Sequence, residues 1–156
     1  MNRLIPTIAL IAFSSCVLAQ SNREEVDLVQ SVFGMEKKAI VSEFIKLDGA
    51  AGDAFWKAYD EYEIKRKDLG QKRLALLSKY IEGYTTLDDE KTEGIVKEMI
   101  ALQSQTDKLI ATYYRKIAKN AGVRPAAQFY QLEGYLLSKI RAEIMENIPV
   151  IGELDR

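Results

Sequence analysis

Apolar residues recur at alternating spacings of four and three along two long stretches of the chain, residues 51–84 and 87–119. This spacing keeps one face of an α-helix pointed in one direction over its whole length. The first stretch would be roughly 50 Å long at 1.5 Å per residue, much longer than an average globular helix. We therefore expect two long helices in an antiparallel hairpin, which offers an extended surface rather than a deep pocket. We call the positions that share this spacing the two stripes. They are Phe55, Tyr59, Tyr62, Arg66, Leu69, Arg73, Leu76 and Tyr80 in the first stretch, and Ile95, Met99, Leu102, Thr106, Leu109, Tyr113 and Ile117 in the second.

Turn residues separate this hairpin from two flanking helices. A first helix is expected over about 23–47, ending at a turn with two glycines near residues 48–52. A fourth helix is expected from Pro125 to about Asn147, because proline suits a first helical turn and Pro149 ends the pattern. The apolar tail after it, residues 148–151, is expected to pack on the protein. The fold class is therefore all-α, with an elongated antiparallel hairpin and about four helices.

Capping residues place the boundaries of the two long helices. Asp53 can cap the first of them, although the helix may begin one or two residues earlier. Thr86, followed by Asp89 three residues later, resembles a capping box at the start of the second. On this interpretation, Thr86→Ala destabilises the protein by about 1 kcal/mol.

The first 19 residues have the pattern of a secretory signal. Arg3 precedes an apolar run that ends in Val-Leu-Ala before Gln20, and the run is too short to span a bilayer comfortably. We expect cleavage there, leaving residues 20–156 as one periplasmic or secreted helical domain without a transmembrane segment. Two alternatives are an uncleaved anchor and a lipid attached at Cys16, the only cysteine. Under the main interpretation the mature chain has no cysteine and no disulfide.

The composition argues against catalysis. The chain has no histidine, so neither of the two commonest transition-metal ligands remains after signal removal, and the usual general base near neutral pH is missing. No phosphate-binding glycine motif is present. The charges balance, with 22 Lys and Arg against 23 Asp and Glu, and no basic block suggests nucleic-acid binding. We expect no enzyme activity, no metal and no cofactor.

Tyrosines are frequent in the last three predicted helices, and tyrosine suits interfaces as well as the edge of a core. A two-helix hairpin buries little surface by itself, so the flanking helices or a second chain must cover it. A homodimer is therefore expected, with paired helices of coiled-coil character. All eight tyrosines lie there: Tyr59, Tyr62, Tyr80, Tyr84, Tyr113, Tyr114, Tyr130 and Tyr135.

Two segments resemble those of a bacterial family. Residues 47–50 and 55–63 read Leu-Asp-Gly-Ala and Phe-Trp-Lys-Ala-Tyr-Asp-Glu-Tyr-Glu. Residues 126–133 read Ala-Ala-Gln-Phe-Tyr-Gln-Leu-Glu and precede Lys-Ile-Arg and Ile-Pro-Val at residues 139–141 and 148–150. These segments resemble the Spy/CpxP (LTXXQ) group of bacterial periplasmic helical proteins. The histidine ligands of its metal-sensing members have no counterpart here.

The resemblance implies an ATP-independent chaperone or envelope-stress protein that binds unfolded clients on a helical surface. An alternative is a signalling accessory or structural envelope protein that docks on one defined partner, such as the periplasmic domain of a sensor kinase. Aromatic, methionine and arginine side chains on or next to the two stripes are the candidates for client or partner contact. They are Phe55, Trp56, Tyr59, Tyr62, Arg66, Arg73, Met99 and Tyr113.

Overall fold

The computed structural model describes residues 36–146 and 148–151. By backbone contacts, the chain forms two compact units, Met1–Ala39 and Ile40–Arg156. In the first unit the described residues, 36–39, are helical. The signal peptide expected over residues 1–19, its Cys16 and the first helix as far as residue 35 lie outside the described residues, so these remain predictions.

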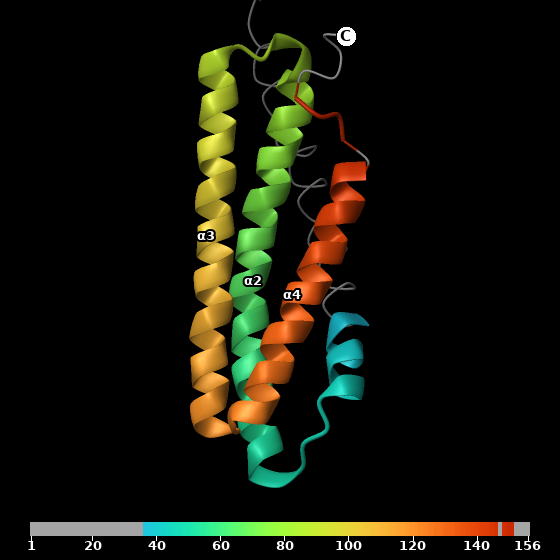
Figure 1. Ribbon diagram of the computed structural model, residues 1–156, viewed down its shortest axis with the longest axis vertical. Coiled ribbons are helices and arrows are strands. Elements are labelled where there is room, and N and C mark those ends of the chain that lie inside the picture. The colour runs from blue at the N-terminus through green and yellow to red at the C-terminus, as the bar shows by residue number, and fades with distance from the viewer. Residues whose placement is uncertain (1–35, 147, 152–156) are drawn as a thin grey trace, which may run out of the picture. The chain divides into compact units, whose positions relative to one another are not determined.

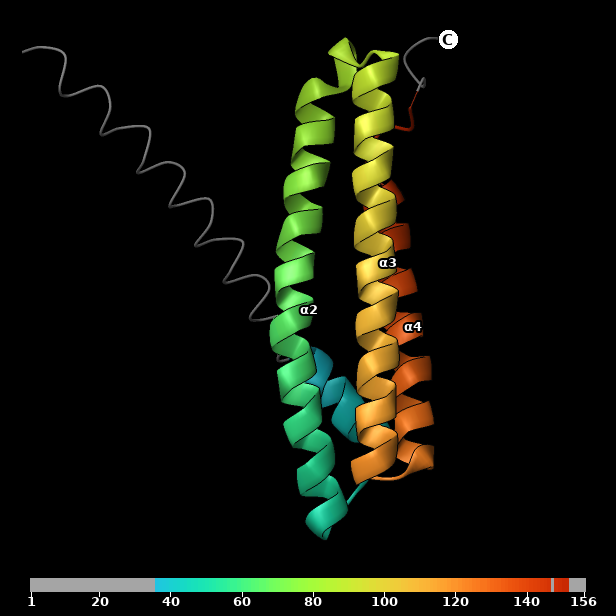
Figure 2. The same cartoon turned by 90° about the vertical axis from the view of Figure 1, so that its left-hand side faces the viewer.

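The second unit contains three long helices. Helix α2 (Gly49–Gly83) and helix α3 (Asp89–Asn120) run antiparallel and are joined by a short 3₁₀ helix, η1 (Tyr84–Thr86). Helix α4 (Val123–Glu146) then runs back along α3 (Figures 1 and 2). No strand occurs among the described residues, and the expected all-α fold with a long antiparallel hairpin is confirmed.

The turn into α2 depends on two glycines. The first helix ends at Phe44, three residues earlier than expected, and Asp48 rather than Asp53 is the residue that precedes α2. Gly49 has a φ of 60°, a left-handed conformation that glycine adopts without steric cost. At Gly52, an added Cβ would lie 2.8 Å from the carbonyl oxygen of Leu47. The absence of a side chain there lets the connecting loop pack directly on the first turn of α2.

The start of α3 differs in detail from the sequence prediction. Asp88 is the N-cap, and its carboxylate accepts a hydrogen bond from the backbone N–H of Lys91 at 2.8 Å. Thr86, the expected cap, belongs to η1, and its hydroxyl donates to the carbonyl of Gly83 at 3.0 Å. The expectation that Thr86 caps α3 is therefore wrong, because the 3₁₀ turn moves the start of the helix two residues along the chain.

The core divides into two clusters along the hairpin. The larger lies at the end where α2 begins and is rich in aromatic rings; the smaller lies near the hairpin turn. Helix α4 contributes buried residues only from its first half, namely Pro125, Ala126, Phe129 and Glu133. The larger cluster contains Val41, Ile45, Phe55, Ala58, Tyr59, Tyr62, Ile110, Tyr113, Ile117, Ala126 and Phe129, and the smaller contains Leu76, Tyr80, Ile95 and Leu102.

The chain after α4 packs against the hairpin turn, as expected from its apolar residues. The hydroxyl of Tyr80 donates to the carbonyl of Pro149, and the hydroxyl of Tyr84 donates to the carbonyl of Val150, both at 2.6 Å. Ile148 packs against the smaller core cluster. Hydrogen bonds from two tyrosines therefore hold residues 149 and 150 against the hairpin turn, beyond the end of α4.

Candidate partner-binding surface

Four of the eight candidate contact residues lie in the core. Phe55, Tyr59 and Tyr62 are fully buried, and Tyr113 is 3% exposed. The rings of Tyr62 and Phe129 meet edge to face, with centroids 5.1 Å apart. These side chains hold α2, α3 and α4 together, and they could touch a partner only if the bundle opened.

A buried polar pair lies within this aromatic cluster. The hydroxyl of Tyr62 donates to Oε2 of Glu133 at 2.6 Å, and both side chains are fully buried. Burial, and then the negative charge of Glu133, raise the pKa of Tyr62 far above that of a free phenol. The sequence reasoning missed Glu133, although a signal was present. Glu133 follows Phe129 by four residues, so a carboxylate occupies the apolar face of α4.

The other four candidates are half-buried and differ in their contacts. Trp56 packs against Phe55, with ring centroids 5.0 Å apart. The guanidinium of Arg66 pairs with Glu63 one turn earlier, with Nε 3.0 Å from Oε2. Only Arg73 and Met99 come together at an open surface.

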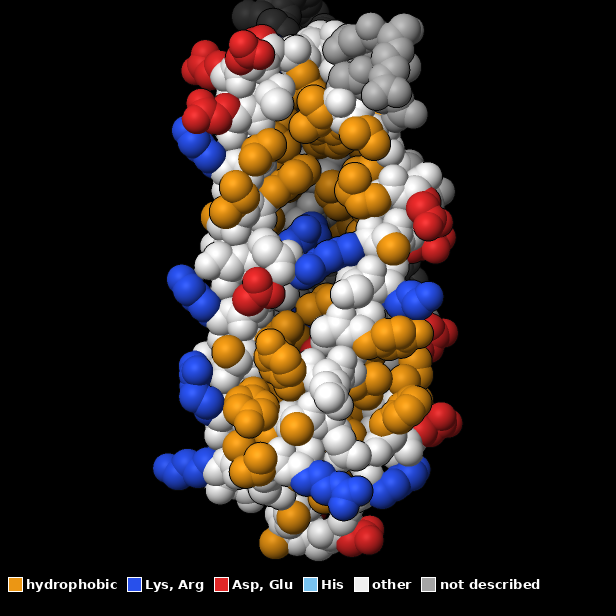
Figure 3. Space-filling view, viewed as in Figure 1, with side chains coloured by type: hydrophobic (Ala, Val, Ile, Leu, Met, Phe, Trp, Pro, Cys, Tyr) orange, Lys and Arg blue, Asp and Glu red, His pale blue; other side chains and the backbone are white. Residues whose placement is uncertain are grey.

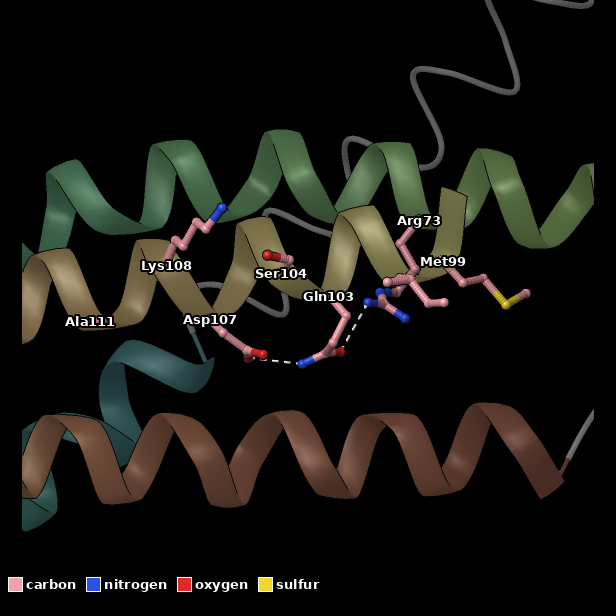
Figure 4. A pocket seen from close by; sticks show the side chains of 8 residues that line it. Arg73, Met99, Gln103, Ser104, Asp107, Lys108 and Ala111 are labelled. Atoms are coloured by element: carbon pink, nitrogen blue, oxygen red, sulfur yellow. Dashed lines mark hydrogen bonds between the residues drawn. The ribbon is translucent and has the colours of Figure 1, made fainter. Parts of the chain in front are cut away.

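That surface, which we call the α3 groove, has a volume of about 710 Å³. Figure 4 shows Gln103 and Asp107 pointing from α3 toward α4, with Arg73 of α2 beside Gln103. Ile100, which lines the groove, is 64% exposed, so the groove presents apolar surface to solvent. The sequence reasoning missed most of these residues, because they flank the apolar stripe of α3. The groove is lined by Arg73, Met99, Ile100, Gln103, Ser104, Asp107, Lys108 and Ala111.

A chain of polar contacts crosses the groove. The guanidinium of Arg73 donates to the amide oxygen of Gln103 at 3.4 Å, and the amide nitrogen of Gln103 donates to Asp107 at 2.8 Å. Burial lowers the pKa of Arg73, and the nearby positive charge of Arg141 on α4 lowers it further, while Asp107 acts in the opposite direction. The charge of Arg141 on α4 therefore acts on the guanidinium of Arg73 on α2.

On the face between α3 and α4, apolar and positively charged side chains lie close together. In Figure 3, apolar side chains gather around a hollow, and Lys and Arg side chains cross its middle. Within the described ranges, no three His, Cys, Asp or Glu side chains are grouped as a metal site would require. None of the helices described is both long enough and apolar enough to cross a membrane. The α3 groove itself presents the apolar side chains of Met99 and Ile100 together with the positive charge of Arg73.

The comparisons with known proteins give no relative from which a role could be transferred. No protein-family model matches the chain, and neither the curated proteins nor the solved structures include a significant match.

Proposed function

We propose that this protein is a secreted or periplasmic chaperone-like protein that binds segments of other proteins in the α3 groove, in the manner that the Spy/CpxP resemblance implies. The observation that carries the proposal is the open groove itself, where Met99 and the exposed Ile100 lie beside Arg73. Exposed apolar surface next to charged groups is typical of surfaces that bind other proteins. The periplasmic location depends on the signal sequence expected over residues 1–19.

The packing of the core favours client binding that does not require the helices to separate. Four of the five aromatic candidates for client contact are buried in the larger cluster, whereas the groove is accessible without any rearrangement. Binding to a surface already formed avoids the entropic penalty of ordering it. Client binding therefore belongs to the groove rather than to the aromatic residues.

An aggregation assay tests this proposal. The mature chain, residues 20–156, in several-fold excess over reduced α-lactalbumin, should slow the rise in light scattering. Ile100→Ser removes an apolar contact worth ~1.5 kcal/mol and should weaken client binding about tenfold. The matched control is Ile64→Ser on α2, at a position that is 74% exposed and outside the groove. Equal loss in both variants, or no suppression by the wild-type chain, would overturn the proposal.

A second candidate function is docking on one defined partner, such as the periplasmic domain of a sensor kinase. The hydrogen-bonded series of Arg73, Gln103 and Asp107 favours it, because fixed polar groups select a partner more strongly than apolar surface does. Crosslinking in cells separates the two candidates. A single dominant adduct supports the defined partner, whereas many adducts support general client binding.

Self-association is a further part of the proposal. We expect a homodimer, because the second half of α4 buries no residue fully and a second copy could cover it. Light scattering should then give twice the mass of the mature chain. A monomer at tens of micromolar would contradict this expectation.

A further inference from the structure

Residues 148–150 lie against the hairpin turn and are held there through their backbone. The hydroxyls of Tyr80 and Tyr84 donate to two successive carbonyl oxygens, those of Pro149 and Val150, each at 2.6 Å. Figure 1 shows this part of the chain, drawn in red after α4, reaching the end of α2. Every residue carries a backbone carbonyl, so these two contacts do not depend on the side chains at positions 149 and 150.

The packing of the turn fixes the two hydroxyl donors in place. Tyr84 begins η1 four residues after Tyr80, and the two rings meet edge to face with centroids 5.6 Å apart. Tyr80 is only 3% exposed. A hydroxyl this deeply buried has little access to water, so losing its carbonyl acceptor is unfavourable. An occupied site is therefore favoured, whichever chain supplies the carbonyl.

One side chain of the segment supplies the apolar contact. Ile148 packs against the smaller core cluster, whereas the side chains of Val150 and Ile151 are 57% and 48% exposed. Pro149 fixes its own φ and disfavours a helical conformation at the residue before it, which limits the conformations of this segment. The contacts therefore specify an apolar residue followed by proline, with the carbonyls of the proline and of the next residue as acceptors.

These contacts can break while the helices stay packed. Among the described residues, none of 148–150 belongs to the larger cluster, which packs α2, α3 and α4 together. A short segment held by two hydrogen bonds and one apolar side chain opens far more readily than a helix packed on a core. Its release would expose the hydroxyls of Tyr80 and Tyr84 and the part of the smaller cluster that Ile148 covers. We call this surface the turn site.

We propose that the turn site binds an extended segment of a partner protein in which an apolar residue precedes proline, and that residues 148–150 occupy it as an intramolecular competitor. The apolar side chain of the partner replaces Ile148. The carbonyl oxygens of its proline and of the next residue accept hydrogen bonds from Tyr80 and Tyr84. Neither tyrosine lines the α3 groove, so this inference does not depend on the proposed function.

A peptide with the sequence of residues 148–151 tests the inference. Acetyl-Ile-Pro-Val-Ile-amide is titrated to millimolar concentration into the ¹⁵N-labelled mature chain and into its Ile148→Ser variant. Amide chemical shifts should change at Tyr80 and Tyr84, and the variant should bind the peptide about tenfold more tightly, because its own segment competes less. Ile151→Ser is the matched control, since Ile151 is largely exposed in the same segment, and it should leave the peptide affinity unchanged.

Two further changes test the contacts themselves. Serine in place of the first isoleucine of the peptide removes the apolar side chain and should weaken binding about tenfold. Tyr80→Phe with Tyr84→Phe, introduced into the Ile148→Ser chain, removes both donors and should weaken binding of the original peptide by about the same factor. Circular dichroism of each variant should match that of the wild-type chain, because no change touches the larger cluster.

The inference is overturned if neither chain shows shift changes at the turn, or if the wild-type and Ile148→Ser chains bind the peptide equally. Residues 148–150 would then only complete the fold. Shift changes confined to residues 99–111 would place the peptide in the α3 groove and would also refute the turn site. Ile100→Ser should leave peptide binding at the turn unchanged, whatever its effect on α-lactalbumin aggregation, so the two proposals can fail separately.

Discussion

The hydrogen bond between Tyr62 and Glu133 joins α2 to α4 inside an otherwise apolar cluster. A buried carboxylate is unfavourable unless hydrogen-bond donors compensate for the water it has lost. The Tyr62 hydroxyl is one such donor, at 2.6 Å. Loss of this donor would leave the buried carboxylate with one hydrogen bond fewer.

Replacing Tyr62 with phenylalanine tests the pair. The ring remains, but Glu133 loses a hydrogen bond in a buried site, so the free energy of unfolding should fall by about 1–3 kcal/mol. Urea denaturation followed by circular dichroism measures the change. Tyr130→Phe is the control, because Tyr130 is 55% exposed and should lose no more than a few tenths of a kcal/mol. Equal effects would show that the buried hydrogen bond contributes nothing.

Replacing two different glycines with alanine should change the stability in opposite directions. Gly52→Ala places a methyl group 2.8 Å from the Leu47 carbonyl oxygen, which belongs to the backbone and cannot rotate away. We expect a loss of about 1–3 kcal/mol in unfolding free energy. Gly94→Ala in α3 meets no atom within 4 Å and should gain up to about 1 kcal/mol from the higher helix propensity of alanine. Thermal melts of both variants would refute the packing argument if the two shifted in the same direction.

At the level of the elements, the two long stripes were predictable from spacing alone. All fifteen of their positions are buried or half-buried. In an uninterrupted helix, residues spaced by three and four lie on one face, so the spacing identifies the face that packs. The capping residue was not predictable in the same way. Thr85, Thr86, Asp88 and Asp89 can all cap a helix, and the choice depends on the 3₁₀ geometry of η1, which leaves no mark in the pattern of apolar residues.

The Asp88 cap gives a pH-dependent prediction. Hydrogen bonding from the backbone of Lys91 lowers the pKa of Asp88, so its stabilising effect is present above the unfolded pKa near ~3.9 and is lost as the pH falls through the lower folded pKa. Asp88→Ala should lower the urea midpoint at neutral pH. The difference from the wild-type chain should disappear in acid.

Asp88→Asn is the matched control for this prediction. Asparagine caps a helix about as well as aspartate but does not titrate. Its stability relative to the wild-type chain should therefore improve as the pH is lowered below about 4, while its midpoint at neutral pH stays above that of Asp88→Ala. If Asn and Ala variants are equally destabilised at neutral pH, the side-chain hydrogen bond is not the source of the stability.

The α3 groove is the part of the surface that the sequence did not predict. The stripe positions Arg73 and Met99 line the groove, whereas the aromatic candidates on the same stripes belong to the core. Spacing shows which residues share a face, but it does not show where along that face a third helix packs. Here α4 covers the aromatic end with Phe129 and leaves the region around Arg73 open. This division depends on the path of α4, which local pattern does not encode.

At the level of the whole second unit, residues 148–150 are held at the hairpin turn by hydrogen bonds from Tyr80 and Tyr84. Tyr80→Phe with Tyr84→Phe removes both donors and keeps both rings. The amide of Val150 should then give a sharper signal and a lower heteronuclear NOE in ¹⁵N relaxation measurements, with amides in α3 unchanged. Unaltered relaxation at Val150 would mean that apolar packing of Ile148 is sufficient to hold the segment.

The central claim is that a closed helical bundle binds protein segments at the α3 groove. Amide chemical-shift mapping of the mature chain with reduced α-lactalbumin tests it most directly. The account predicts that the largest changes fall at Arg73 and at residues 99–111, while Phe55, Tyr59 and Tyr62 keep their positions. Changes concentrated at those core aromatics, or spread evenly along all three helices, would contradict it.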